Sequence, residues 1–399
     1  MNTVSAARAL DRYSGPREVD HVSGSAPVRF ARDPAVSATG RYVAWNGALP
    51  GQVAGSFDVF LTDRVSGTTE HLTPGADNGS GAPSVSADGR LVAFDSHATN
   101  LVPDDTNGRG DVFVYDRQTR ATTRITGAEG GASPALSGDG RYVAFTSGPE
   151  LRLHDLQTGQ TSTLASEGRS PSLSEDGRFV AFEQGSRAVR LDRQTGELLP
   201  VPAPDPAQRS LAPTLSADGR VVAFLAVPEV DPMSMAVARP PSHLYVRDLE
   251  TGATRGVDRD HEDRPLEAVG GFSLSADGHA IAFEADPGFR RLVLQTDLET
   301  GKTRVVNARP DGSIDYGENL GPALSADGRT VVLATSCRNL GPQQVRVEGG
   351  LEPYRIFAID SNNTQLGIER AAAELPQEPG TIEVGERTVD IGGIRLPRR

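Results

Sequence analysis

The sequence of 399 residues lacks several features that would place it in a common protein class. Its one cysteine, Cys337, excludes an internal disulfide framework and a zinc site built from several cysteines. No segment approaches the roughly 18 consecutive apolar residues of a membrane helix, and residues 1–30 lack the apolar core of a signal peptide. The chain as given is expected to be soluble, and either extracytoplasmic, if a signal peptide was trimmed, or cytoplasmic.

Lysine is nearly absent, because Lys302 is the only one and all other basic residues are arginine. The chain has 40 basic and 53 acidic residues, which gives a formal charge of -13. This excess of negative charge repels phosphate backbones and anionic lipids. We therefore expect neither nucleic acid nor a membrane surface as a partner.

Signatures of common enzymes are missing as well. The sequence contains no Gly-x-Ser-x-Gly elbow, no phosphate-binding P-loop and no His-Glu-x-x-His motif. These motifs are easy to recognise, so no reaction can be assigned from a motif.

What the sequence does contain is a nine-residue pattern that occurs seven times. One copy reads SADGRLVAF, and an Asp-Gly or Thr-Gly pair precedes the apolar run in every copy. Asp-Gly between two apolar runs is a strong hairpin signal, because glycine accepts a positive φ without a Cβ clash. The copies begin at Ser37, Ser86, Ser137, Ser174, Ser216, Ser275 and Ser325.

A second hairpin pattern follows many of the copies, with an alternating apolar strand that ends in Asp, a Thr-Gly turn and a returning strand. Each unit is therefore predicted to have four antiparallel strands. Because one such sheet cannot bury both of its faces, the units are expected to pack around an axis as an all-β propeller that forms a single domain, residues 1–399. The second hairpins are at 111–126, 151–164, 188–201, 243–257 and 292–306.

The number of blades is predicted from the spacing. The first and last copies are six steps apart and the average step is 48 residues, so 399 residues correspond to about 8.3 units. Residues 6–23 and 380–392 each look like half a blade. We favour eight blades, closed by pairing the N- and C-terminal segments, because seven would leave two hairpins with exposed edges. Seven blades is the alternative.

The Ser-x-Asp-Gly-Arg hairpin followed by Asp-x-x-Thr-Gly resembles the repeat of TolB-like propellers, which are similar in shape to WD-repeat proteins. The resemblance extends over nearly the whole chain. It implies a bacterial propeller that is often extracytoplasmic and serves mainly to bind proteins. It implies no catalytic residue, because the repeated positions are structural.

The innermost strands have short sequences such as SVS and ALS, and strand alternation predicts that their Ser, Ala and Thr side chains face the central channel. Small hydroxyl groups catalyse little without an adjacent base, which favours binding over catalysis.

Two metal sites are considered, although none is expected. In the segment PDDTNGRGD, Asp105, Asn107 and Asp111 could hold calcium, but the glycine is misplaced for an EF-hand loop and a simple turn is the alternative. His97, His243 and His261 could form a tri-histidine site only if they converged at the channel mouth.

Long loops are predicted on the face opposite the tight turns, and long loops are where function concentrates. We expect a ligand site there, on units five to seven. Its candidate residues are Met233, Met235, His261, Asp263, Arg264, Asp315, Tyr316 and Glu318.

Two functions are compatible with these observations. The first is a non-catalytic, monomeric propeller that binds a protein, a cell-surface ligand or a small molecule on its long-loop face. The second is a lyase, isomerase or cyclase, in which His261, Asp263 and Glu318 would supply acid and base groups at the channel mouth. Small channel residues and the lack of a catalytic motif favour the first.

Overall fold

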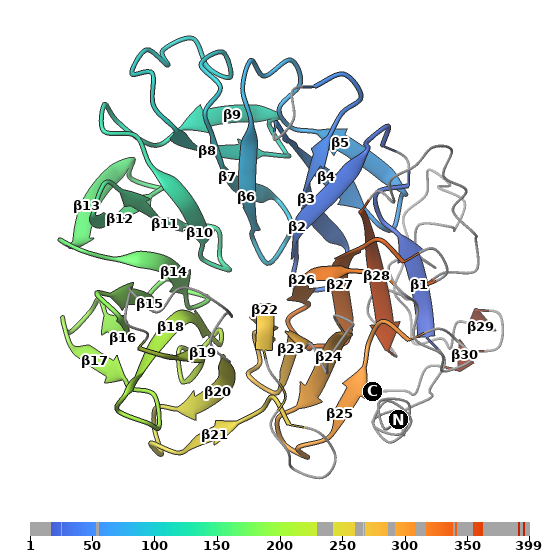
Figure 1. Cartoon of the computed structure of the whole chain (residues 1–399). Helices are drawn as coiled ribbons and strands as arrows, with labels where there is room; N and C mark the ends of the chain where they lie inside the picture. Colours follow the sequence, from blue (N-terminus) through green and yellow to red (C-terminus); the bar gives the residue numbers. More distant parts are fainter. Residues whose placement is uncertain are drawn as a thin grey trace.

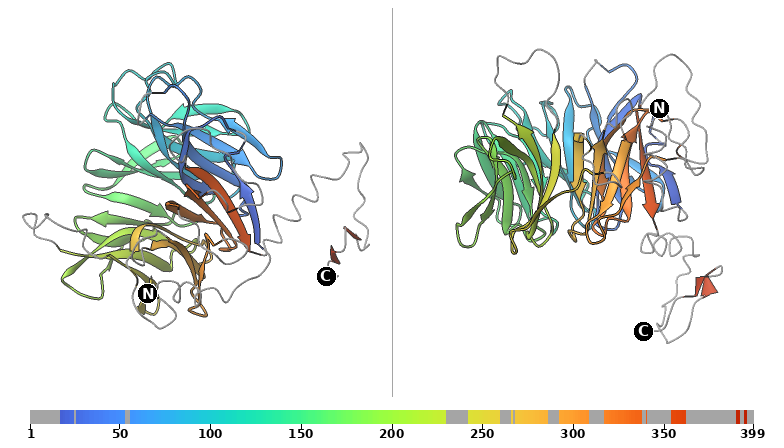
Figure 2. Two further views of the ribbon diagram at one scale, coloured as in Figure 1. Left: turned by 45° about the vertical axis from the view of Figure 1, so that its right-hand side comes forward. Right: turned by 60° about the horizontal axis from the view of Figure 1, so that its bottom comes forward.

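The computed structural model shows a ring of seven four-stranded antiparallel sheets around a central channel (Figure 1). Seen from the side, the sheets form a ring about one strand length thick (Figure 2). In the part of the chain that the structure describes, all regular secondary structure is β, and no helix is long and apolar enough to cross a membrane. The structure describes residues 17–24, 26–52, 56–229, 242–259, 266, 268–285, 292–308, 317–337, 340, 354–361, 390–391 and 394–395.

Blades 1 to 7 are numbered along the chain, and the first strand of each is the innermost. Blade 1 contains β2 (Phe30–Val36), β3 (Tyr42–Ala48), β4 (Asp58–Asp63) and β5 (Thr68–His71). Blade 2 contains β6 (Ser80–Val85), β7 (Leu91–Ser96), β8 (Asp111–Asp116) and β9 (Ala121–Arg124). Blade 3 contains β10 (Ala132–Leu136), β11 (Tyr142–Ser147), β12 (Glu150–Asp155) and β13 (Gln160–Ala165). Blade 4 contains β14 (Arg169–Leu173), β15 (Phe179–Gln184), β16 (Arg187–Asp192) and β17 (Leu198–Val201).

The second half of the ring repeats this order until the last blade. Blade 5 contains β18 (Gln208–Leu215), β19 (Val221–Pro228), β20 (His243–Asp248) and β21 (Thr254–Gly256). Blade 6 contains β22 (Ala268–Leu274), β23 (Ala280–Ala285), β24 (Leu292–Asp297) and β25 (Thr303–Val305). Blade 7 contains β26 (Asn319–Leu324), β27 (Thr330–Thr335), β28 (Arg355–Ser361) and, as its outer strand, β1 (Arg17–His21).

The structure has seven blades. The preference for eight is therefore wrong, and the alternative of seven is confirmed. β1 pairs antiparallel with β28, so the N-terminal strand completes the seventh blade instead of starting an eighth. The ring is thus closed by pairing an N-terminal with a C-terminal strand. In the C-terminal segment expected to share a blade, β29 (Asp390–Ile391) pairs only with β30 (Ile394–Arg395), while residues 380–389 and 392 lie outside the described residues.

The repeated serine and aspartate fold the first hairpin of blades 2 to 7, and blade 1 has Thr39 in place of the aspartate. In blade 3, Ser137 Oγ donates to Asp139 Oδ1 (2.6 Å) and accepts the N–H of Tyr142 (2.9 Å), while Asp139 Oδ1 accepts the N–H of Arg141 (2.9 Å). Gly140 between them has φ +74°, a conformation that a side chain disfavours. The serine that ends each innermost strand is at most 1% exposed. These hydroxyl groups are therefore used to hold the turn, and the prediction that they face the channel is wrong for them.

The repeated arginine joins the two hairpins of a blade. Arg141 Nη2 lies 2.8 Å from Asp155 Oδ2, at the end of the third strand, and Arg90 makes the same pair with Asp116 at 2.7 Å. This hydrogen bond is the main reason that the pKa of Asp155 is lowered to about 2. The two sequence motifs therefore form one structural unit.

The apolar run of each copy builds the core between blades. Seven buried clusters separate neighbouring blades, and each contains the large side chain of the run from the second strand. Phe145 of blade 3, for example, packs on Val112 and Val114 of blade 2. The large side chains are Trp45, Phe94, Phe145, Phe182, Phe224, Phe283 and Leu333.

Backbone hydrogen bonds also connect the blades around the channel, next to the tight turns. Ala38 N–H donates to Ala87 O at 2.9 Å, Ala87 N–H donates to Gly138 O at 2.9 Å, and further bonds of this kind link each blade to the next. The last one runs from Ala326 N–H to Ala38 O at 2.9 Å and so closes the circle.

Candidate functional site

The long-loop face carries the connections from the second to the third strand of each blade and those between blades. In blades 3 and 4 the second-to-third-strand connections are residues 148–149 and 185–186. In blade 2 the equivalent connection is residues 97–110, far more than a turn requires. It is fully described, so its interactions can be followed in detail.

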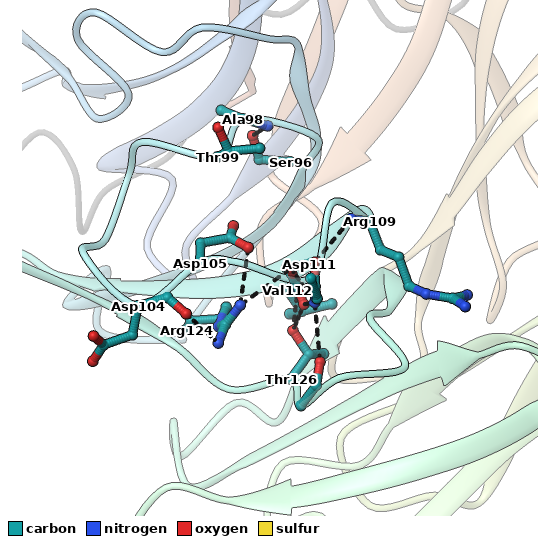
Figure 3. Close-up of polar contacts among 12 residues, drawn as sticks. Ser96, Ala98, Thr99, Asp104, Asp105, Arg109, Asp111, Val112, Arg124 and Thr126 are labelled. Atoms are coloured by element: carbon teal, nitrogen blue, oxygen red, sulfur yellow. Dashed lines mark hydrogen bonds and ion pairs between the residues drawn. The ribbon is translucent and has the colours of Figure 1, made fainter.

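Buried charges anchor the inner part of this connection (Figure 3). Arg124 Nη1 lies 2.9 Å from Asp105 Oδ1 and 3.6 Å from Asp111 Oδ2, and both carboxylate side chains are fully buried. Asp111 Oδ1 also accepts the hydroxyl of Thr126 at 2.5 Å. Burial, with the nearby charge of Asp111, raises the pKa of Asp105.

The same residues were considered as a calcium site. Asn107 directs its amide nitrogen to both oxygens of Asp111, at 3.1 and 2.8 Å, and its Oδ1 accepts the N–H of Arg109 at 2.8 Å. The guanidinium of Arg124 lies between the two aspartates, where it supplies the positive charge that a bound cation would supply. These contacts fit the alternative of a structural turn better than a set of calcium ligands.

The outer part of the connection is bonded to the preceding loop, residues 72–79. Asp77 accepts the N–H and the hydroxyl of Thr99 at 2.8 and 2.7 Å, and Asn100 Nδ2 donates to Gly75 O at 2.8 Å. The hydroxyl bond of Thr99 is the main cause of the lowered pKa of Asp77. Blades 1 and 2 thus share an ordered polar surface, which we call the blade 2 platform: residues 75–78 and 97–110.

Of the eight predicted site residues, the structure describes one. Glu318 is exposed beside β26, its N–H donates to Ser336 Oγ at 2.9 Å, and its carboxylate accepts the hydroxyl of Tyr354. The other seven lie outside the described residues and remain predictions: Met233, Met235, His261, Asp263, Arg264, Asp315 and Tyr316.

Five of the six described histidines contact a structural partner. His243 Nδ1 is 3.0 Å from the buried Asp258, and His71 Nε2 is 3.0 Å from the buried Asp58. His21 stacks on Phe357, and burial, with the charge of Arg355, lowers its pKa to about 4. His97 and His243 belong to blades 2 and 5, while His261 lies outside the described residues. Within the described ranges, no three His, Cys, Asp or Glu side chains form a group that could hold a metal ion.

The channel wall shows a pattern that sequence reasoning missed. In blades 2, 4 and 6, a carboxylate of the second strand accepts a backbone N–H from the next blade, as Glu183 Oε1 does from Ala212 at 2.7 Å. In the same blades a serine of the innermost strand accepts another N–H, as Ser172 does from Leu215 at 3.0 Å. The other pairs are Asp95 with Ser133, Glu284 with Gly321, Ser84 with Leu136 and Ser273 with Leu324.

The N–H groups that these carboxylates accept are positioned by bulges in the innermost strands. The residue before proline has a positive φ, for instance 51° at Ala212, and the strand pairing shifts at that point. The bulge turns its N–H toward the neighbouring blade, where the carboxylate receives it. Blades 1, 3, 5 and 7 have Asn46, Thr146, Leu225 and Ala334 at the carboxylate position. The sequence signal was therefore visible as alternating acidic and neutral residues after the apolar run.

Comparisons with known proteins show propellers of the same fold. No protein-family model matches the chain, and no curated protein matches it. An oligogalacturonate lyase in complex with manganese is 12% identical with a TM-score of 0.56, and one from Vibrio parahaemolyticus is 13% identical with a TM-score of 0.54. Each of these matches covers 86% of this chain and 96% of the other.

TolB from Acinetobacter baumannii is 19% identical with a TM-score of 0.47, and the match covers 67% of this chain and 63% of the TolB chain. TolB proteins are thus among the similar structures, as the resemblance of the repeats predicts. At these identities the likeness concerns the fold alone: this chain is a seven-bladed β-propeller whose repeats resemble those of TolB-like propellers.

Proposed function

We propose that this protein is a non-catalytic β-propeller that binds a protein or a cell-surface ligand through its long-loop face. The blade 2 platform is the observation that carries the proposal. Its connection is much longer than the fold requires, yet Asp105, Asp111 and Arg124 fix it from below. A surface that is ordered before binding loses little conformational freedom when a partner arrives.

The exposed chemistry of the platform is suited to recognition. His97, Thr99, Asn100, Asp104 and Arg109 are all exposed there. Together they offer donors, acceptors and charges of both signs, which is typical of the polar part of a protein interface. The repeated Ser and Asp side chains hold turns, and the repeated Arg side chains join the two hairpins of a blade, so they do not supply a catalytic group.

The proposal can be tested by photo-crosslinking in the native host. A benzophenone amino acid at Thr99 or Arg109 is expected to give one discrete adduct, whereas the same group at Gln194, in a tight turn of blade 4, gives none. The same group at Asn78, on the part of the platform that is kept, should give an adduct that is lost when residues 98–109 are replaced by the two-residue connection of blade 3. Discrete adducts from Gln194 alone would contradict the proposal.

The second candidate function is a lyase, and it is kept because two solved relatives of the same fold are oligogalacturonate lyases. In this case Glu318, with His261 and Asp263, would supply the acid and base groups. Incubation with oligogalacturonate and manganese, followed by the absorbance of the unsaturated product, tests it. Turnover that is lost in Glu318→Gln would replace the binding proposal by the enzymatic one.

A further inference from the structure

A groove of about 810 Å³ opens between blades 2 and 3, and it meets the blade 2 platform at Arg124, which lines the groove and pairs with Asp105. Leu91, Val114, Ile125 and Leu156 are its apolar side chains. Its polar side chains come from the tight turns and the outer strands: Asp88, Arg90, Asp116, Arg124, Asp139, Arg141, His154 and Gln157. The groove therefore combines an apolar floor with a charged rim.

The two neighbouring interfaces are filled at the corresponding place. Between blades 1 and 2, the guanidinium of Arg117 stacks 4.2 Å from the ring of Tyr42, and the ring lies against Gly89. Between blades 3 and 4, Arg193 stacks on Tyr142, also at 4.2 Å. The residues at these repeat positions between blades 2 and 3 are Leu91 and Leu156. Loss of a phenol ring and a guanidinium from one place accounts for the groove.

At the interface between blades 2 and 3, a backbone carbonyl oxygen also has no side-chain donor among the described residues. The carbonyl oxygen of the turn glycine accepts a side-chain N–H in five of the seven blades, for example Gly89 O from Arg117 at 3.3 Å. For Gly140, which lines the groove, no such donor is found among the described residues. Gly278 is the other exception. It lies at the interface between blades 5 and 6, where Arg255 of blade 5 donates to Leu298 O of blade 6. The other four pairs are Gly40 with Arg64, Gly177 with Arg193, Gly219 with Arg190 and Gly328 with Gln295.

The charges on the rim favour a cation. Arg90, Arg124 and Arg141 are each in an ion pair with an aspartate. Asp88 and Asp139 accept hydrogen bonds from a serine hydroxyl and a backbone N–H, but neither forms an ion pair within the described residues. His154 Nδ1 is hydrogen-bonded to Thr161 Oγ1 at 2.8 Å. Because burial lowers the pKa of His154, its ring adds no positive charge near neutral pH.

We propose that this groove binds an arginine side chain, next to an aromatic residue, of a partner protein. The guanidinium donates to Gly140 O and faces Asp88 and Asp139, as Arg117 donates to Gly89 O one interface earlier. The aromatic ring covers Leu91 and Leu156, where neighbouring interfaces hold a tyrosine of their own. The partner thus restores from outside the pair that this interface lacks.

The probe for the test is the capped dipeptide acetyl-tyrosyl-arginine amide, and its control is the same peptide with citrulline. Citrulline has nearly the same shape but no charge. We expect the arginine peptide to bind about tenfold more tightly, because a hydrogen bond to a charged group is stronger than one to a neutral group. Shifts of backbone amide NMR signals should map to Gly140 and Leu156. Equal affinities, or shifts elsewhere, would overturn the proposal.

Three variants locate the site. The double variant Leu91→Tyr with Leu156→Arg rebuilds the stack of the neighbouring interfaces, and we expect it to weaken binding at least tenfold while the melting temperature is kept. Asp139→Asn retains the acceptor Oδ1 for Ser137 and Arg141, and should reduce the preference for arginine over citrulline. Tyr142→Leu with Arg193→Leu opens the next interface and should create a second site. Unchanged binding in the filled variant contradicts the proposal, even if the opened variant is unstable.

This site and the blade 2 platform can fail separately. Filling the groove leaves residues 97–110 intact, so crosslinks from Thr99 should persist in the filled variant. Replacement of residues 98–109 should in turn leave the affinity for the arginine peptide unchanged.

Discussion

The interface that closes the ring and the interface between blades 2 and 3 use the same repeat positions in opposite ways. At the closing interface, the side chain of Arg64 of blade 1 is 1% exposed and lies 2.5 Å from Asp360 of β28 and 2.6 Å from Asp20 of β1. At the other interface, two leucines leave a groove. The closing interface therefore contains a buried cation between two carboxylates, whereas the interface between blades 2 and 3 has a groove in its outer part.

The largest effect is expected from breaking the closing interface. Arg64→Ala leaves the buried carboxylate of Asp360 without its cation and should lower the free energy of unfolding by about 3–5 kcal/mol. Urea denaturation measures this value. Arg90→Ala, which removes an exposed pair with Asp116, serves as the control and should cost much less. Equal losses in both variants would show that closure does not depend on Arg64.

The second prediction compares a filled with an open interface. A Cβ at Gly89 would lie 2.0 Å from Tyr42 Cδ2, whereas one at Gly140 would lie 3.1 Å from Leu91 Cδ1. Both glycines have a positive φ, so the backbone strain of Gly89→Ala and Gly140→Ala is similar. We expect Gly89→Ala to be the less stable by about 1–3 kcal/mol, the cost of overpacking. Thermal denaturation of the two variants decides the point.

A smaller effect is expected at the channel wall. Glu183→Ala removes the acceptor of the Ala212 N–H and should cost about 1 kcal/mol. Gln184→Ala, at the exposed next position, should have no measurable effect. If both variants unfold at the same urea concentration, the alternating carboxylates do not stabilise the ring.

The smallest effect concerns pH. The pKa of Asp155 is lowered to about 2, chiefly by the hydrogen bond from Arg141, so its ionised form is favoured in the folded protein. Its contribution is present above the ordinary aspartate pKa and is lost as pH falls from about 4 to about 2. NMR titration of the Asp155 carboxyl carbon should give this low value. In Arg141→Ala it should return toward about 4; no change would contradict the role of Arg141.

The propeller fold could be predicted because each repeat carries its own turn chemistry. The blade number could not, because the last repeat has no Asp-x-x-Thr-Gly hairpin after β28 and its missing strand comes from residues 17–21. The average spacing was divided into the full length of 399 residues, so both chain ends were counted as parts of blades. A search for the repeat that lacks a second hairpin would have identified the recipient of the N-terminal strand.

The ligand site predicted on units five to seven stays a prediction, because seven of its eight residues lie outside the described residues. The length of residues 97–110 correctly indicated an elaborated long-loop face, but the aspartates there looked like metal ligands because their partner, Arg124, follows in the next hairpin. The groove was missed because it arises where Leu91 and Leu156 occupy the repeat positions that hold a tyrosine and an arginine at the two neighbouring interfaces. Only an alignment of the repeats with each other reveals it, since a leucine is not unusual at the start of a strand, as Leu91 is, or just after one, as Leu156 is.

The alternating channel-wall acceptors have a geometric consequence. A pattern that repeats every two blades can close without a fault only in a ring with an even number of members. With seven, two blades of the same kind must adjoin, and here they are blades 7 and 1, with Ala334 and Asn46 at the carboxylate position. The one mismatch in the parity of the ring thus falls next to the blade in which the N-terminal strand joins the C-terminal strand, and a buried arginine also links blades 1 and 7 there.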